Sequence, residues 1–197
     1  MFQKKTIAHL IKELPAFPEH LQLMYLILFC TGIRKSEVCT IKSGAFYSQG
    51  NENWMRIYQS KMRREKVIPV PSLLVGLVND YEKKYGIKNG EYLFKNKKGG
   101  AFNGQTFSNQ MIRECKARGI ACGDYIFRAH DYRHNLATSM YGNGVSIQGV
   151  RDYLGHSSEN MTQQYIDFMP ERIVSAEDKY FSRNQSFKLK GVEDDER

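Results

Sequence analysis

The longest apolar run in the chain, from about Leu21 to Cys30, is the feature that most restricts its fold. A bilayer-spanning helix needs about 20 apolar residues, and this run is too short. It lies within a predicted helix that starts near Pro18 and ends at Gly32. The residues predicted to face inward from this helix are Leu21, Met24, Tyr25 and Leu28. We therefore expect a globular domain built around a hydrophobic core.

Further helices and a hairpin follow from periodicity, capping residues and glycine stops. A first helix is predicted from an N-cap at Thr6 to Pro15, and Ser146 is a predicted N-cap for a later one. The remaining predicted helices cover residues 35–41, 71–85, 105–118, 130–141 and 146–154. Residues 54–59 and 66–70 are rich in aromatic and β-branched side chains, which predicts two strands joined by a basic loop. Pro69 places the second of them at a sheet edge, and residues 92–94 suggest one more short strand.

The net charge is +8 over 197 residues. The last segment, 182–197, holds four basic and four acidic residues, so the excess lies in the body, residues 1–181. A basic body attracts polyanions, of which nucleic acid is the commonest. The alternative is a positive surface that only aids solubility. We interpret 182–197 as a polar, flexible tail.

The four cysteines form no Cys-x-x-Cys pair, which argues against a zinc knuckle or a redox motif. A chain of this length does not need disulfides for stability, and the first residues lack the apolar core of a signal peptide. We therefore expect a cytoplasmic protein.

Two basic segments in the first third of the chain could bind an anion. In the first, Gly32 ends one helix and Arg34 opens the next, where helix amides and a guanidinium face the same side. Glu37 lies one turn further and could orient Arg34; the alternative is an ordinary surface ion pair. In the second, Lys61 occupies the hairpin loop, where it could donate a proton, contact phosphate or only be solvated. Its basic neighbours are Arg63, Arg64 and Lys66.

The segment from Ala129 to Tyr165 contains the other candidates. His130 and Arg133 are three residues apart and share a helix face. His134 lies four residues from His130, which resembles a zinc-protease pair but lacks a third ligand. His156 follows a helix-ending glycine, where it could cap the helix or face a cleft. Tyr165 could equally be a packing residue.

In combination these residues suit attack on a phosphodiester. A phenol with a pKa near 10 is ionised to about one part in a thousand at pH 7, so a nucleophilic tyrosine needs cations and a base beside it. Arginines hold phosphate oxygens in forked geometry and stabilise the charge of the transition state.

With these motifs the sequence resembles the catalytic domain of tyrosine recombinases, the phage integrase family, through about residue 168. The matching features are Thr-Gly-Ile-Arg-Lys-Ser-Glu at 31–37, the hairpin Lys61, His-x-x-Arg at 130–133, Leu-Gly-His at 154–156, and Tyr165 nine residues later. Departures are residues 42–46, which lack the family's aromatic-Asp pattern, and residues 159–161, which replace its usual small residues.

The resemblance implies an α+β fold, mainly helical, with a small antiparallel sheet at one edge. It implies site-specific DNA strand exchange in which Tyr165 attacks a phosphate and forms a 3′-phosphotyrosine. Arg34, Arg133 and His156 would bind the phosphate, Lys61 would protonate the leaving oxygen, and His130 would act as acid and base, with Glu37 in support. No metal or nucleotide cofactor is implied. The partners would be double-stranded DNA and further copies of the chain, as a tetramer on DNA. We assign additional DNA contacts to Arg63, Arg64, Lys66, Lys97 and Lys98.

Three alternatives stay open at this point. The family usually carries a preceding helical domain that grips DNA, and the chain begins at the catalytic domain, so it could be a catalytically silent DNA-binding fragment. A zinc-dependent hydrolase would use His130 and His134. A type IB topoisomerase shares the chemistry, although the Leu-Gly-His context favours a recombinase.

Overall fold

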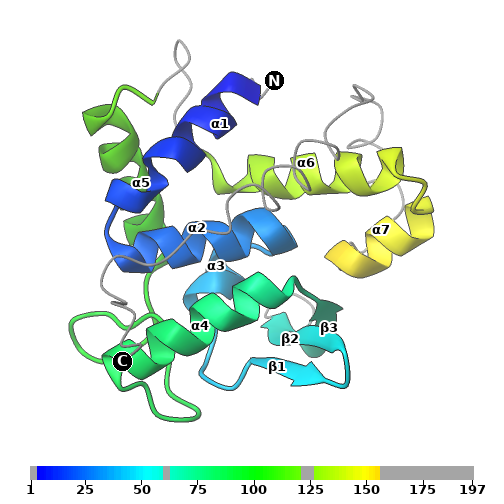
Figure 1. Ribbon diagram of the computed structural model, residues 1–197, viewed down its shortest axis with the longest axis horizontal. Helices are drawn as coiled ribbons and strands as arrows, with labels where there is room; N and C mark the ends of the chain where they lie inside the picture. Colours follow the sequence, from blue (N-terminus) through cyan, green and yellow to red (C-terminus); the bar gives the residue numbers. More distant parts are fainter. Residues whose placement is uncertain (1–3, 60–62, 121–126, 156–197) are drawn as a thin grey trace, which may run out of the picture.

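The computed structural model describes residues 4–59, 63–120 and 127–155. These residues form a body of α-helices with one small sheet (Figure 1). The elements in chain order are α1 (Lys4–Glu13), a 3₁₀ turn (Leu14–Ala16), α2 (Glu19–Thr31), α3 (Lys35–Cys39), β1 (Phe46–Gln49), β2 (Glu52–Gln59), β3 (Arg64–Pro69), α4 (Ser72–Tyr85), α5 (Gly104–Ala117), α6 (Ala129–Gly142) and α7 (Ile147–Leu154). The predicted α+β class, mainly helical with a small antiparallel sheet, is confirmed.

The apolar helix α2 lies at the centre of this body, with the other helices around it (Figure 1). Every residue from Leu21 to Leu28 is buried, so the helix is covered on its whole circumference and not only on the predicted stripe. The one polar side chain in that stretch, Gln22, donates to the Phe17 carbonyl at 2.8 Å. This hydrogen bond offsets the cost of burying an amide.

An aromatic cluster joins α2 to α6. Tyr25 and Tyr132 meet edge to face with ring centroids 5.2 Å apart, and Phe29 lies edge-on to Tyr132 at 6.3 Å. Phe127, just before α6, packs on Tyr132 at 5.6 Å. Because large buried rings fix the rotation of a helix as well as its distance, this cluster decides which side of α6 faces the end of α2.

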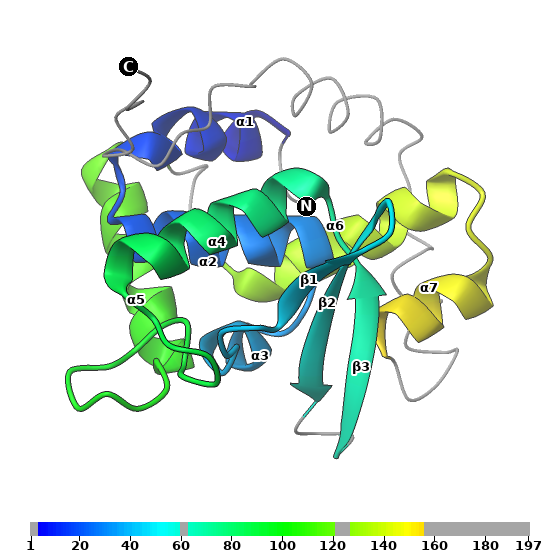
Figure 2. The ribbon, with the colours of Figure 1, turned by 60° about the horizontal axis from the view of Figure 1, so that its bottom comes forward.

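The sheet is antiparallel with strand order β1-β2-β3. The predicted hairpin is β2 and β3, and Pro69 does lie on an edge strand. Its inner face buries apolar side chains from all three strands: Phe46, Met55, Ile57 and Ile68. Figure 2 shows the sheet extending away from the helices, with α7 beside β3. Strand β1 was not predicted, and Tyr92 forms only an isolated bridge with Lys42 instead of the expected strand.

Most predicted helix ends agree with the structure, and the exceptions have local causes. Thr6 is not an N-cap, because α1 starts earlier and Thr6 is buried inside it. Ser146 does cap α7, since its Oγ accepts from the Gly149 amide at 3.1 Å. Gly155 ends α7 in the left-handed conformation, with φ of 67°. Among the described residues, no helix is both long and apolar enough to cross a bilayer. The predicted tail at 182–197 lies outside the described residues.

At Gly32 the end of α2 packs closely against α6 and α7. Its φ is +58°, and a Cβ added there would lie 2.8 Å from a Leu136 methyl carbon and 3.4 Å from the Arg133 Cα. Glycine is therefore required at this position both by the left-handed backbone and by the close approach of another helix.

We predict that Gly32→Ala lowers the free energy of unfolding by about 2–4 kcal/mol, because backbone strain and overpacking add. Gly50→Ala is the matched control, since Gly50 has φ of +60° but nothing within 4 Å of its added Cβ. Gly50→Ala should cost only the backbone strain, about 1–2 kcal/mol. Urea unfolding of both variants measures the difference, and equal losses would contradict the close packing at Gly32.

Candidate active site

A pocket of about 530 Å³ lies between the start of α3 and the start of α6. Four of its lining residues are basic and come from the two helices and the residues before them: Arg34, Lys35, Arg128 and Arg133. The other polar residues of the lining are His130, Ser36 and Ser108. The structure therefore brings together three sequence-predicted site residues, Arg34, His130 and Arg133, across about 100 residues of chain.

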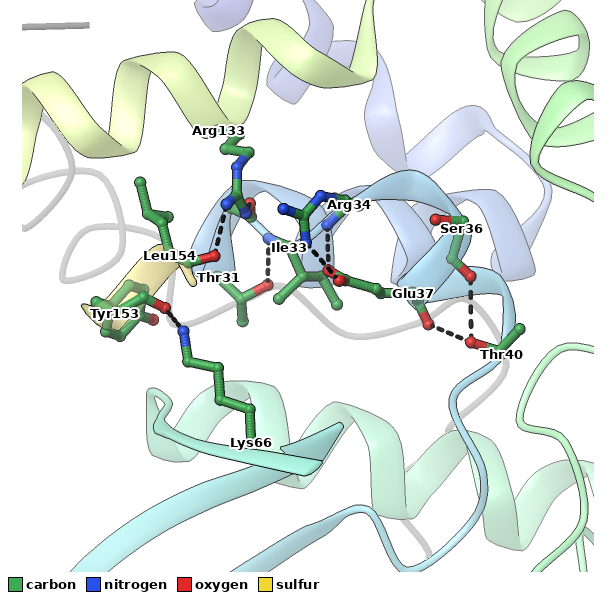
Figure 3. Close-up of polar contacts among 11 residues, drawn as sticks. Thr31, Ile33, Arg34, Ser36, Glu37, Thr40, Lys66, Arg133, Tyr153 and Leu154 are labelled. Atoms are coloured by element: carbon green, nitrogen blue, oxygen red, sulfur yellow. Dashed lines mark hydrogen bonds and ion pairs between the residues drawn. The ribbon is translucent and has the colours of Figure 1, made fainter. Parts of the chain in front are cut away.

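Arg34 is held by Glu37, one turn further along α3. The Glu37 carboxylate accepts from the Arg34 backbone amide at 2.7 Å and from its Nη1 at 2.9 Å (Figure 3). Glu37 is only 4 % exposed, whereas the Arg34 side chain is 24 % exposed. A buried carboxylate that holds both ends of a residue fixes its guanidinium more firmly than an exposed pair does. Within the described residues the Arg34 guanidinium makes no other hydrogen bond, which suits it to a ligand.

Arg133 is buried, at 2 % exposure, and connects three parts of the chain. From α6 its Nη1 donates to the Gly32 carbonyl at 3.0 Å, and its Nη2 donates to the Leu154 carbonyl at 2.5 Å. Arg34 lines the same pocket, and Figure 3 shows the polar contacts of both side chains. Two guanidinium groups in fixed positions at one pocket form a site for an anion with several oxygens, such as phosphate.

His130 lies one turn before Arg133 on α6 and lines the same pocket. Partial burial lowers the pKa of His130, and the nearby Arg133 and Arg34 lower it further. Its imidazole is therefore largely neutral at pH 7 and able to accept a proton. Burial also lowers the pKa of His134, the second histidine of the zinc alternative. No group of three or more potential metal ligands occurs in the part of the chain that the structure describes.

Lys66 lies beside this site instead of extending from the hairpin surface. Its ammonium donates to the Tyr153 carbonyl in α7 and lies 5.6 Å from the centre of the Tyr153 ring. Burial lowers the pKa of Lys66 to about 8, and Arg133, Arg64 and Arg34 add to this while Glu37 opposes it. These influences place Lys66 within the electrostatic field of the two arginines.

The other predicted residues are either exposed or outside the described residues. Arg63 and Arg64 are exposed where the hairpin enters β3. Lys97 and Lys98 are exposed in the connection between α4 and α5, which both ribbon views place at the opposite end of α4 from the sheet. The structure thus does not bring these two lysines to the pocket, and DNA contact by all four residues stays a prediction. Lys61, His156 and Tyr165 lie outside the described residues.

Two basic residues of the pocket were missed by sequence reasoning. Lys35 donates to the Ser108 hydroxyl of α5 at 3.3 Å, and Arg128 precedes α6 at the pocket wall. Each neighbours a predicted residue in sequence, and that proximity was the only available signal. Contact between α3 and α5 spans more than 70 residues and depends on the tertiary fold.

Comparison with known proteins identifies the family to which the chain belongs. Residues 1–172 match the model of the phage integrase family. Transposase B from transposon Tn554 of Staphylococcus aureus (strain Mu50 / ATCC 700699) is 29% identical over 181 residues, which are 89% of this chain and 29% of that protein. Tyrosine recombinase XerC of Rickettsia bellii (strain RML369-C) is 28% identical over 155 residues, which are 78% of this chain and 48% of that protein.

Among solved structures, XerH site-specific recombinase bound to difH substrate in a pre-cleavage complex superimposes with a TM-score of 0.68. The likeness covers 83% of this chain and 49% of that one, at 21% sequence identity, and shows the fold. The chain thus spans less than half of each of these three proteins. The matched motifs, the paired arginines and the family match over most of its length agree that this chain belongs to the phage integrase family of tyrosine recombinases.

Proposed function

We propose that this chain is the catalytic domain of a site-specific DNA recombinase that cuts and rejoins strands through a 3′-phosphotyrosine on Tyr165. The observation that carries the proposal is the convergence of Arg34 and Arg133, with the neutral His130, on one pocket. Membership of the family supports recombination as the reaction class. DNA as substrate is supported by the basic pocket and by the likeness in fold to XerH, a site-specific recombinase whose structure was solved bound to its difH substrate.

The two arginines would bind the non-bridging oxygens of the scissile phosphate, where they stabilise the charge of the pentacoordinate transition state. The Tyr165 oxygen attacks phosphorus while the bond from phosphorus to the 5′ oxygen breaks. His130 accepts the phenol proton, and Lys61 supplies a proton to the departing 5′ oxygen. His156 adds a hydrogen bond to the phosphate. The free 5′-hydroxyl later attacks the phosphotyrosine in reverse, so the phosphodiester energy is conserved.

The partners in this proposal are double-stranded DNA and further copies of the chain, in the tetramer that the family resemblance implies. A cytoplasmic site of action is part of the same proposal. The competing proposal is a DNA-binding domain without activity of its own; the chain spans 48% of XerC. The two proposals differ in whether a covalent protein–DNA adduct forms.

We predict that Tyr165→Phe abolishes covalent capture of DNA while leaving affinity within about 2-fold, because only the nucleophilic oxygen is lost. A nicked duplex library with a randomised centre serves as the probe, and adducts are separated on a denaturing gel. An adduct with the Phe variant at wild-type yield would contradict the role of Tyr165. Absence of any adduct with the unmodified chain, despite DNA binding, would favour the silent-domain alternative.

Arg34→Ala should slow adduct formation on captured library DNA on the order of 100- to 1,000-fold at saturating DNA, because one transition-state donor is removed. Arg113→Ala is the matched control, since the Arg113 side chain is 71 % exposed on α5 and lies outside the pocket lining. The measurement is a single-turnover time course on the denaturing gel. An Arg34 variant within a few-fold of the control would remove Arg34 from the mechanism.

A further inference from the structure

We propose that Lys66 is a positioning residue for strand transfer: together with Gln59 and Arg133 it forms a socket that holds the C-terminal end of α7. We call these three residues the α7 socket. The inference rests on the proposed function for its catalytic consequence, but its structural part concerns only the described residues.

The first observation is that two consecutive carbonyls at the end of α7 each accept from a cation. Lys66 of β3 donates to the Tyr153 carbonyl, and Arg133 of α6 donates to the Leu154 carbonyl (Figure 3). The last carbonyls of a helix have no partner within the helix and carry the negative end of its dipole. The two cations therefore satisfy these acceptors from two different elements, one in the sheet and one in the helical body.

The second observation is the contact of Gln59 with Gly155, the residue that ends α7. A Cβ added to Gly155 would lie 2.7 Å from both the Oε1 and the Nε2 of Gln59. Gln59 is 1 % exposed, and its Oε1 has no hydrogen-bond partner within the described residues. The end of α7 thus lies directly against a buried amide from β2, and a side chain at position 155 would have to displace that amide.

The third observation is that a lysine at position 66 carries a free-energy cost, because its charged ammonium is partly removed from water. Lys66 is half-buried with its ammonium over the Tyr153 ring, and three arginines disfavour its charge whereas one carboxylate, Glu37, favours it. An apolar side chain could cover the same ring without the cost of desolvating a charge. The feature that an apolar residue cannot supply is a directed donor to the Tyr153 carbonyl.

The position of the socket in the chain gives it a consequence for catalysis. Lys66 follows Lys61 by five residues in the hairpin, and Gly155 immediately precedes His156. The socket therefore joins β3, which follows Lys61 in the chain, to α7, which precedes His156. A shift of about 1 Å in reacting groups can cost on the order of 100-fold in rate. A loosened socket is expected to slow the reaction without weakening DNA binding to the same degree.

The test compares Lys66→Met, which keeps an apolar stem but no donor, with Lys66→Arg, which restores a cationic donor. Lys83→Met, at an exposed position on α4, is the matched control. Hydrogen–deuterium exchange of the free protein should show amides in the last turn of α7 exchanging at least about 10-fold faster in Lys66→Met. They should be near wild type in Lys66→Arg and in the control. Exchange unchanged in Lys66→Met would overturn the socket whatever the DNA results.

The catalytic part is measured on library DNA captured by the unmodified chain. Lys66→Met should lower the single-turnover rate at saturating DNA on the order of 10- to 100-fold, with affinity within about 2-fold and with recovery in Lys66→Arg. If Lys66 instead contacts phosphate, Lys66→Met lowers the affinity for DNA and reduces the slope of log affinity against log salt by about 1. The single-turnover rate at saturating DNA is then unchanged, and the proposal is wrong. If Lys66→Met does not fold, Lys66→Leu, which also lacks a donor, replaces it under the same criteria. Failure of the unmodified chain to form adducts would refute the proposed function but not the exchange result.

Discussion

The buried guanidinium of Arg133 is the interaction on which the site depends most. A buried charge is costly unless its donors are satisfied, and here the carbonyls of Gly32 and Leu154 accept two of them. These carbonyls terminate α2 and α7, so one side chain from α6 fixes the ends of two other helices. The same side chain lines the pocket. Its structural role and its proposed role in phosphate binding therefore cannot be separated by deleting it, whereas Arg34, held only by Glu37 within the described residues, allows that separation.

The apolar helix α2 acts as the common support for both arginines. Its left-handed end at Gly32 turns the chain directly into Arg34 and α3. Its aromatic residues Tyr25 and Phe29 pack against Tyr132, the residue next to Arg133 on α6. Because Tyr132 faces the core, its neighbours on α6 are oriented by the same packing. The relative placement of the two arginines thus depends on the core contacts of α2 and on the short connection at residues 32–34.

Sequence reasoning succeeded where the relevant interactions are local. Arg34 and Glu37 are three residues apart at a helix start, so their pairing follows from helix geometry, and the β2–β3 hairpin follows from composition. Sequence reasoning failed for β1, because residues Tyr47, Ser48 and Gln49 are too polar to indicate a strand without their partner β2. Sequence reasoning also did not foresee the contact of Lys66 with Tyr153, because the two residues are 87 positions apart; DNA contact by Lys66 stays a prediction. The alternation of β3 contained a usable signal: Lys66 shares a strand face with the buried Ile68.

The charges around Lys66 and His130 indicate that the pocket suits an anionic ligand. Arg34, Arg133 and Lys66 influence one another, and Glu37 is the one carboxylate among the groups that shift the pKa of Lys66. Burial lowers the pKa of Lys66 and of His130, and the neighbouring positive charges lower both further. A phosphodiester between the arginines would reverse that influence, since an anion favours the protonated forms. The negative charge of the phosphate increases in the pentacoordinate transition state, so the repulsion among the cations is offset most at that point. A positive site that is already rigid before DNA binds therefore favours the transition state over the ground state.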